Sequence, residues 1–150
     1  MQLTDPISAV LMHKGQEIWS LSPAASVYEA IELMSEKRVG ALLVISEGRL
    51  AGVISERDYA RKVILQGRHS RETEVQEIMT SPVIYVTPEH SVEECMMTMT
   101  NHRIRHLPVV VDGHKVVGVL SIGDLVKWII SAHEETIHQL NAYIAGNYPA

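Results

Sequence analysis

The sequence predicts a mixed α/β (α+β) fold made of two similar halves related by a pseudo-two-fold axis. The first observation is an internal duplication: residues 23–59 align with residues 88–125, His114 being one insertion, and 13 of 37 positions are identical. The second is that the same order of strand and helix patterns occurs in both copies. A repeat offset of 65 residues is too long for a solenoid, so two copies imply a pair with matching clefts.

Each copy predicts the order strand, helix, strand, strand, helix. Runs rich in β-branched and aromatic residues predict first strands at residues 18–21 and 82–86. Ser26 and Ser91 occupy helix N-cap positions, and acidic residues follow in the first turn. Apolar residues then recur at i, i+3, i+4 and i+7 in both helices: Val27, Ala30, Ile31 and Met34, and Val92, Cys95, Met96 and Met99.

Two apolar strands and a second helix complete each copy. Residues 41–45 and 107–111 are continuously apolar, which indicates strands covered on both faces. Glu47-Gly48 and Asp112-Gly113 predict tight hairpin turns that lead into return strands at residues 50–54 and 116–120. The second helices are expected over residues 58–65 and 124–130.

These elements divide the chain into four parts. We expect repeat 1 at residues 7–67, a polar linker at 68–76, repeat 2 at 77–132, and a C-terminal helix and tail at 133–150. The helix is expected to reach Ile144, and the last five residues to fray. Its apolar residues are predicted to form an oligomer contact because they have no place in a two-repeat core: Trp128, Ala132, Ile137, Leu140 and Ile144.

Composition excludes several classes of protein. With 46% hydrophobic residues in a chain of 150, a globular protein with a filled core is expected. The net charge of −5 argues against a nucleic-acid surface, which needs a basic face. No apolar run approaches the ~18–20 residues of a membrane span, and the N-terminus lacks a signal pattern. Together with the single cysteine, Cys95, these features predict a cytoplasmic protein that contacts neither membrane nor nucleic acid.

Both third strands end in the motif Gly-φ-φ-Ser-x-x-Asp, where φ is apolar, at residues 52–58 and 118–124. The free N–H groups at the start of the following helix favour an anion. The serine can donate to phosphate or sugar, and the aspartate can accept two hydrogen bonds from ribose hydroxyls. In the alternative interpretation, Ser-x-x-Asp is a capping box that satisfies only the local backbone. Its occurrence at equivalent places in both copies favours the binding role.

With their Arg103–Val110 segment and their Met79-Thr80 entry, the two repeats resemble a CBS-domain pair, or Bateman module, over residues 7–132. The resemblance implies a stand-alone, non-catalytic regulatory module, without a metal requirement, that senses cellular energy state. Its inter-repeat clefts would bind an adenosine-containing ligand: AMP, ADP, ATP, NAD or S-adenosylmethionine.

Carried over residue by residue, the resemblance implies two unequal sites. In the first, Asp124 binds ribose, Ser121 sugar or phosphate, and Arg105 and His106 phosphate, with an adenine wall of Ile18, Trp19 and Val39. In the second, the polar roles fall to Ser55, Arg57 and Asp58, with Thr80 at the edge of an apolar wall of Val83, Ile84, Tyr85 and Ile104. Copy one has Gly40 and Ala41 in place of the strand cations Arg105 and His106, so the two clefts should differ in affinity.

Other functions have weaker support. His102 and His106 have the spacing of a zinc pair, but they are expected to straddle a helix end and a strand entry, without a third ligand nearby. Cys95 is at a core phase of its helix, which is typical of a small hydrophobic residue. No nucleophile, base and orienting group recur together, so an enzyme is not expected. The competing class is an oligomerisation or partner-docking scaffold with vestigial clefts; a homodimer is expected in either case.

Overall fold

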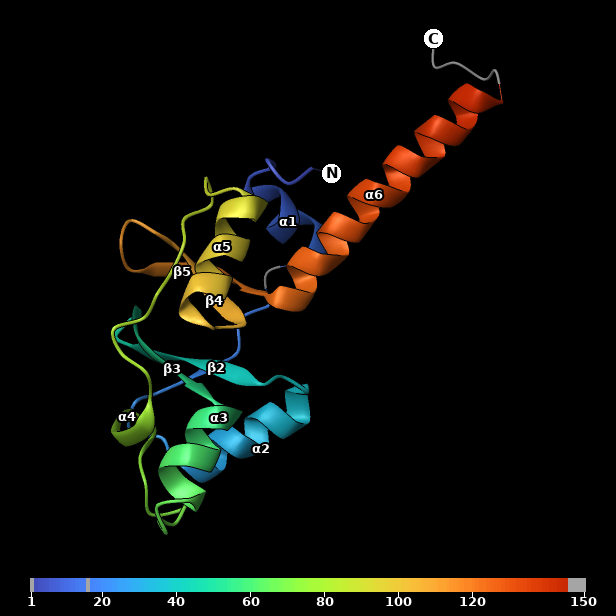
Figure 1. Ribbon diagram of the computed structural model, residues 1–150. Coiled ribbons are helices and arrows are strands. Elements are labelled where there is room, and N and C mark those ends of the chain that lie inside the picture. Colours follow the sequence, from blue (N-terminus) through green and yellow to red (C-terminus); the bar gives the residue numbers. More distant parts are fainter. Residues whose placement is uncertain (1, 16, 146–150) are drawn as a thin grey trace. The chain divides into compact units, whose positions relative to one another are not determined.

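The computed structural model describes residues 2–15 and 17–145, and it is a mixed α/β structure, as predicted (Figure 1). In chain order the elements are α1 (Ile7–Lys14), β1 (Ser20–Leu21), α2 (Val27–Lys37), β2 (Ala41–Ser46), β3 (Arg49–Ser55), α3 (Glu56–Tyr59), the π-helical turn η1 (Ala60–Ile64), α4 (Val75–Ile78), α5 (Val92–His102), β4 (His106–Val111), β5 (Lys115–Ser121) and α6 (Ile122–Ile144).

The first long helices of the two repeats, α2 and α5, begin and end in the same way. The hydroxyl of Ser26 accepts from the Glu29 N–H at 3.1 Å, and that of Ser91 accepts from the Glu94 N–H at 3.1 Å. Both helices end at an arginine in the left-handed region, with φ of 56° in α2 and 54° in α5. The predicted N-caps are therefore confirmed. The buried residues also follow the predicted helical phases: Val27, Ala30 and Met34, and Val92, Cys95 and Met99.

Both predicted hairpins are confirmed. β2 pairs antiparallel with β3, from Ala41 opposite Ser55 to Ser46 opposite Arg49. β4 and β5 form a separate two-stranded sheet. The turn residues have positive φ in both copies, 51° and 76° at Glu47-Gly48 and 54° and 76° at Asp112-Gly113. Two successive positive φ values are those of a type I′ turn, which joins β2 and β3 with two residues, whereas the inserted His114 lengthens the connection between β4 and β5 to three.

The first strand of repeat 1 is shorter than predicted. The strand predicted at residues 82–86 does not form, so that prediction is wrong. β1 is two residues long and pairs parallel with β2, Ser20 opposite Leu43 and Leu21 opposite Val44. In copy two, only Val86 makes an isolated bridge. Val86 is buried, whereas Tyr85 is 45% exposed, so the segment lacks the covered, pleated surroundings that turn β-propensity into a strand.

The second helices begin earlier than predicted. α3 starts at Glu56 and passes into η1, and α6 starts at Ile122. α6 reaches Ile144 as expected, and the last five residues lie outside the described part of the chain.

The chain forms two compact units that interleave in sequence. Unit 1 comprises residues 1–16, 86–107 and 120–150, and unit 2 comprises residues 17–85 and 108–119. The N-terminal helix α1 therefore belongs with α5 and α6 of the second repeat. Neither α1 nor α4 was predicted, although Ile7, Val10 and Leu11 have helical spacing.

α1 and α4 have equivalent roles in their units. The Ile7 N–H in α1 donates to the His90 carbonyl, and the Val75 N–H in α4 donates to the Ala25 carbonyl, both at 2.8 Å. In return, the Val92 N–H donates to the Asp5 carbonyl at 2.9 Å, and the Val27 N–H donates to the Thr73 carbonyl at 2.8 Å. Each long helix thus satisfies part of its N-terminus with the segment that precedes α1 or α4. In unit 2 that segment lies within the predicted linker.

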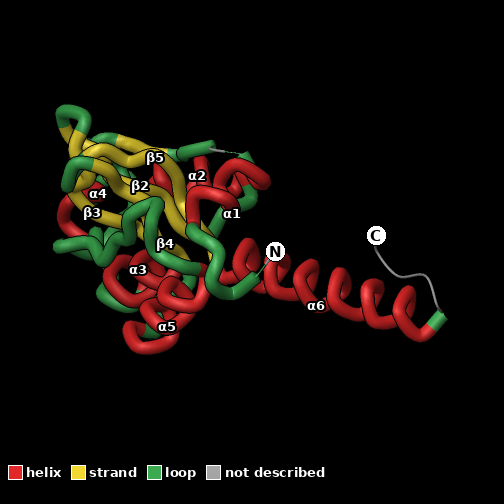
Figure 2. The backbone as a smooth tube through the Cα atoms, turned by 90° about the horizontal axis from the view of Figure 1, so that it is seen from above, coloured by secondary structure: helices red, strands yellow, loops and turns green. Residues whose placement is uncertain are grey.

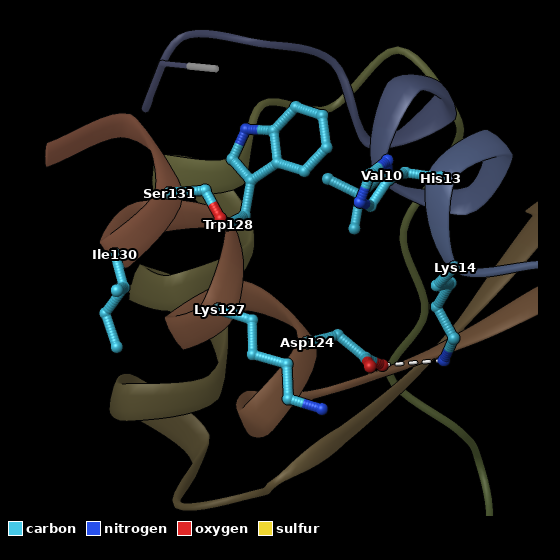
Figure 3. A pocket seen from close by; sticks show the side chains of 8 residues that line it. All are labelled: Val10, His13, Lys14, Asp124, Lys127, Trp128, Ile130 and Ser131. Atoms are coloured by element: carbon cyan, nitrogen blue, oxygen red, sulfur yellow. Dashed lines mark hydrogen bonds and ion pairs between the residues drawn. The ribbon is translucent and has the colours of Figure 1, made fainter. Parts of the chain in front are cut away.

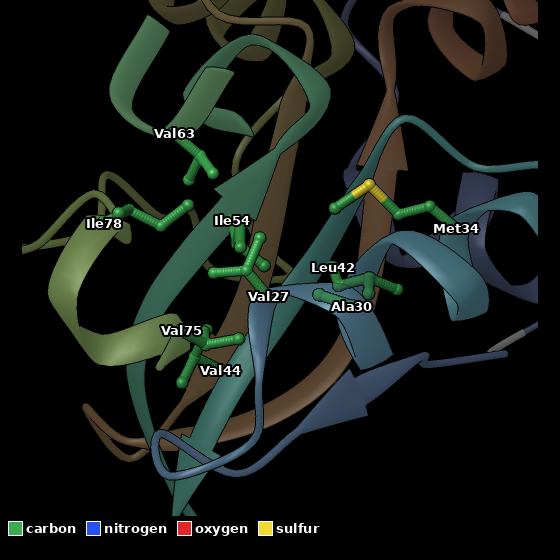
Figure 4. Packing of buried hydrophobic residues seen from close by; sticks show 9 residues of the cluster. All are labelled: Val27, Ala30, Met34, Leu42, Val44, Ile54, Val63, Val75 and Ile78. Carbon is green, nitrogen blue, oxygen red and sulfur yellow. The ribbon is translucent and has the colours of Figure 1, made fainter. Parts of the chain in front are cut away.

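The core of unit 2 lies between its sheet and its helices. α2 packs against β2, and α3 and α4 pack against β3. The side chains meet in one cluster (Figure 4): Val27, Ala30, Met34, Leu42, Val44, Ile54, Val63, Val75 and Ile78. These elements hold the turn between β3 and α3 in place.

The first turns of α6 pack within unit 1, and the rest projects from it (Figures 1 and 2). Trp128 is 8% exposed, and its indole N–H lies 3.3 Å from both the Gln2 carbonyl and the Asp5 carboxylate. Ala132 is half-buried. The predicted oligomer contact is therefore wrong at Trp128, because this side chain packs within unit 1. For the other four residues of the stripe it stays a prediction.

Candidate functional site

Both signature motifs lie at a junction between a strand and a helix, as predicted. β3 ends at Ser55 and α3 begins with the next residue, while β5 ends at Ser121 and α6 begins with the next. Asp58 and Asp124 are each the third residue of their helix. The sequence therefore places a hydroxyl and a carboxylate together at the start of each second helix.

The capping-box geometry is present in both copies. The Ser55 hydroxyl accepts from the Asp58 N–H at 3.1 Å, and the Asp58 Oδ2 accepts from the Ser55 N–H at 3.0 Å. In copy two, the corresponding distances for Ser121 and Asp124 are 3.1 and 2.8 Å. Each carboxylate thus has a structural role at the start of its helix. Whether it can also bind a small molecule depends on the residues that surround it.

Asp58 is enclosed within unit 2. It is 8% exposed, and its Oδ1 lies 3.1 Å from the Lys62 ammonium and 3.4 Å from the Thr80 hydroxyl. Lys62 also donates to the Ile78 carbonyl at 2.9 Å. The structure therefore brings the predicted residues Ser55, Asp58 and Thr80 together. Their contacts bind α3 to the segment that follows α4.

Asp124 faces a pocket within unit 1. The pocket has a volume of about 560 Å³ (Figure 3), and its lining residues come from α1 and α6: Val10, His13, Lys14, Asp124, Lys127, Trp128, Ile130 and Ser131. The Lys14 ammonium lies 2.6 Å from the Asp124 Oδ2. The imidazole of His13 meets the Trp128 ring edge-on, with centroids 5.9 Å apart. A carboxylate, basic side chains and an apolar wall therefore share one cavity.

The charge of Lys14 controls the acidity of Asp124. Burial raises the pKa of the Asp124 carboxyl, but the hydrogen bond and charge of Lys14, with the Ser121 N–H, outweigh burial and hold the pKa below its ordinary value. Because the folded protein favours the ionised form, the contact stabilises the fold above the unfolded pKa of about 3.9, and this stabilisation is lost as pH falls through the lower folded pKa.

We expect Asp124→Asn to lower the free energy of unfolding by about 1 kcal/mol at pH 7, the upper range for a partly exposed ion pair. The difference from the wild type should shrink as the pH is lowered below 4, because the wild-type carboxylate is then protonated too. Urea unfolding between pH 7 and pH 3 measures this difference. Lys14→Met should show the same pH dependence; a difference that is constant down to pH 3 would contradict the assignment.

The other predicted residues of the first site are divided between the units. In unit 1, the Arg105 carbonyl accepts from the Ile122 N–H at 2.8 Å, which places Arg105 beside the start of α6, and His106 begins β4. Ile18, Trp19 and Val39 lie in unit 2 and are half-buried. There the Lys37 ammonium lies 4.4 Å from the centroid of the Trp19 ring. The adenine wall at these three residues stays a prediction.

The second predicted site is divided in the same way. Ser55, Asp58 and Thr80 are together in unit 2, and Arg57 is exposed beside them. The predicted wall residues of unit 2 are Val83, Ile84 and Tyr85, while Ile104 is in unit 1. Val83, Ile84 and Ile104 are half-buried. Their joint role also stays a prediction.

Sequence reasoning missed the residues that α1 brings to Asp124. Lys14 is 110 residues from Asp124 along the chain, and nothing in the local sequence of either residue indicates the pairing. The helical spacing of residues 7–11 could have revealed α1, but not its position in unit 1. Lys127 could have been found, because it follows Asp124 by three residues on the predicted helix.

The other chemical groups do not form a competing site within the described residues. Cys95 is fully buried, and burial, reinforced by the neighbouring charge of Glu94, raises the pKa of its thiol to about 12. This thiol is therefore protonated at neutral pH. No three histidine, cysteine, aspartate or glutamate side chains of residues 2–15 and 17–145 are grouped as metal ligands.

Comparison with known proteins identifies the repeats. The family model of the CBS domain matches residues 7–65 and again residues 75–131. The chain belongs to the CBS-domain family. CBS-domain pairs are generally regulatory modules, and the two matched segments make this chain such a pair.

Curated relatives with similar sequences include other CBS-domain proteins. The mitochondrial CBS domain-containing protein CBSX3 of Arabidopsis thaliana is 44% identical over 152 residues, which cover 95% of this CBS pair and 73% of the relative. YhcV of Bacillus subtilis is 36% identical over 109 residues, covering 73% of this chain and 76% of the relative.

Solved structures confirm the fold. A CBS-domain protein from Burkholderia ambifaria is 50% identical, with a TM-score of 0.81 over 85% of this chain and 95% of that chain. The tandem CBS fold predicted from the repeat is therefore confirmed. None of the helices within the described ranges is long and apolar enough to span a bilayer.

Proposed function

We propose that this CBS-domain pair is a stand-alone, non-catalytic regulatory module that binds an adenosine-containing ligand, with Asp124 as the acceptor for the ribose hydroxyls. The observation that carries the proposal is the pocket beside Asp124. A carboxylate can accept two hydrogen bonds from a cis-diol, and the basic residues Lys14 and Lys127 suit a phosphate group. The apolar side chains of Val10 and Trp128 supply surface for the less polar part of such a ligand.

A solved CBS pair supports the class of ligand. The CBS pair of protein MJ0100 is solved in complex with 5′-methylthioadenosine and S-adenosyl-L-methionine; it is 24% identical to this chain, with a TM-score of 0.76. At this identity the likeness concerns the fold alone. Because that shared fold holds adenosine compounds in MJ0100, an adenosine compound is the first class to test, and AMP, ADP, ATP, NAD and S-adenosylmethionine are the candidates.

We propose that the two sites differ in affinity, with the Asp124 site the stronger. Arg105 lies beside the start of α6 and His106 begins β4, whereas Gly40 and Ala41 are their counterparts in copy one. In addition, Asp58 is more enclosed than Asp124 and already holds Lys62 and Thr80. This enclosure favours the second candidate function, a scaffold, for copy one. The proposed module is a cytoplasmic homodimer that regulates a protein partner.

Calorimetric titration of the full chain with AMP, ATP, NAD and S-adenosylmethionine tests the function. We expect saturable heat with at least one ligand. That ligand should also stabilise the fold, by about 2.7 kcal/mol when its concentration is a hundred times its Kd. Ribose 5-phosphate and inorganic phosphate are the controls, because they carry the anion without adenine. If none of the four ligands produces heat or a thermal shift, the scaffold function replaces the sensor.

A further inference from the structure

The exposed apolar residues of α6 follow a heptad pattern. Among the residues of this helix whose exposure the structure describes, the large exposed hydrophobic ones all fall on one set of positions spaced by four, three or seven residues: Val126, Ile130, Ile137, Leu140 and Ile144, with exposed fractions of 41, 50, 57, 57 and 82%. The remaining position of the set is His133, which is also exposed. The complete series 126, 130, 133, 137, 140, 144 alternates steps of four and three, which is the a/d seam of a coiled coil. We call these six residues the α6 seam.

The helix extends beyond the part of unit 1 that covers it. α1 and α5 pack against α6, and residues 133–141 are all exposed. Figures 1 and 2 show the C-terminal part of α6 with no other element of its unit beside it. At 1.5 Å per residue, the helix is about 34 Å long. Most helical stability in proteins comes from packing of an apolar face, so an unsupported seam of this length calls for a partner.

We propose that the α6 seam binds the α6 seam of a second copy of this chain in a parallel, two-stranded coiled coil. This inference deepens the homodimer of the proposed function and gives it a surface. The residue types select two parallel strands: Ile130, Ile137 and Ile144 occupy the a positions, and Val126, His133 and Leu140 occupy d. β-branched residues at a, with leucine at d, favour parallel dimers.

The charges beside the seam favour the same orientation. In the antiparallel register that pairs all six positions, Glu134 of one helix would flank Glu134 of the second copy. In the parallel register, the residue flanking Glu134 is Ile129, and Thr136 flanks Asn141. Only the antiparallel arrangement places like charges together. The seam also matches itself position by position, so association of two copies closes without leaving an open end.

His133 is the polar layer of the seam. A polar residue at one core position of a coiled coil specifies its register and lowers its stability. In the parallel dimer the two His133 side chains face each other, between the layers of Ile130 and Ile137. Replacement of His133 by an apolar residue should therefore strengthen association. A surface position outside an interface would show no such effect.

The oligomeric state of the full chain tests the inference by sedimentation at several concentrations. We expect a dimer whose dissociation constant rises at least a hundredfold in Ile137→Glu/Leu140→Glu and falls at least tenfold in His133→Leu. Gln139→Glu places a glutamate on the outer face of the same helix and should leave the constant unchanged. Circular dichroism and a cooperative thermal transition check that each variant folds.

Orientation is tested with Ile144→Cys, because the native Cys95 is buried. In the parallel dimer the two introduced thiols are adjacent and should form an intermolecular disulfide under mild oxidation. In the antiparallel dimer they lie at opposite ends, so a dimer without the cross-link overturns the parallel seam. If the wild type is a dimer and the double glutamate variant remains one, the homodimer stands and the seam is wrong. A monomeric wild type overturns both.

Discussion

Asp124→Ala is expected to lower the affinity of the protein for its adenosine ligand by about ten- to hundredfold, the loss that follows removal of a hydrogen bond to a charged group. Asp124 lies in the first turn of α6 and faces a pocket of about 560 Å³. Among the described residues that line this pocket, it is the only one with a carboxylate. Calorimetric titration of wild type and variant with the tightest ligand from the initial screen gives the ratio of the two dissociation constants.

The variant also loses the acceptor for the Ser121 N–H, so folding and binding must be separated. Asp124→Asn keeps an oxygen for that N–H and loses only the charge, and it should still bind more weakly than the wild type. Glu134→Gln, at an exposed position of the same helix, is the matched control for removing one negative charge. Unchanged affinity in folded Asp124→Ala would show that the carboxylate serves the helix start alone.

Asp58→Ala is expected to reduce stability more, and to affect the stronger binding site less, than Asp124→Ala does. Its carboxylate is 8% exposed and holds Lys62, Thr80 and Ser55, so the variant is expected to lose more stability than Asp124→Ala. Any effect on binding should fall on the second, weaker site, and the strong site should keep its affinity.

Gly52→Val is expected to lower the free energy of unfolding by about 1–3 kcal/mol, because it overfills a packed position. A Cβ atom at Gly52 would lie 2.5 Å from the Met79 sulfur and 3.1 Å from the Thr80 carbonyl oxygen. The Met79 side chain can move, but Thr80 is held by two backbone hydrogen bonds with Val53, of 2.8 and 3.1 Å. Thermal unfolding followed by circular dichroism measures the loss.

Gly123→Ala is the matched control from the second signature motif. A Cβ atom there meets only the Ser121 hydroxyl, at 3.5 Å, which is an ordinary contact. On a helix, alanine in place of glycine should leave stability unchanged or raise it by about 0.4–1 kcal/mol. Truncation of Met79 to alanine in the Gly52→Val background should recover part of the loss, as expected for residues in contact. A Gly52→Val protein as stable as the wild type would contradict the packing.

Residues 82–86 show where local patterns are insufficient. This segment has the composition of a strand, yet only Val86 bridges, whereas the equivalent residues of copy one join a sheet through β1. Strand formation depends on a neighbour and on cover for the side chains, neither of which is encoded within the five residues. The same reason explains the error at Trp128, whose neighbours Gln2 and Asp5 come from the other end of the chain.

The sequence by itself determined the features that depend on residues a few positions apart. The serine caps of α2 and α5, the positive-φ hairpin turns and the Ser-Asp pairs at the starts of α3 and α6 all close hydrogen bonds over two to four residues, so composition and spacing suffice to predict them. Because the sequence is duplicated, each of these features is predicted in both copies.

Only the tertiary structure decided which distant residues surround the carboxylate of each motif. It placed α1 in the unit of the second repeat, which brings Lys14 to Asp124 across 110 residues, and it enclosed Asp58 with Lys62 and Thr80. Two motifs of the same pattern thus have different electrostatic surroundings. The physical reason is that long-range packing is selected by the burial of complementary surfaces, which leaves no periodic trace in the sequence near either carboxylate.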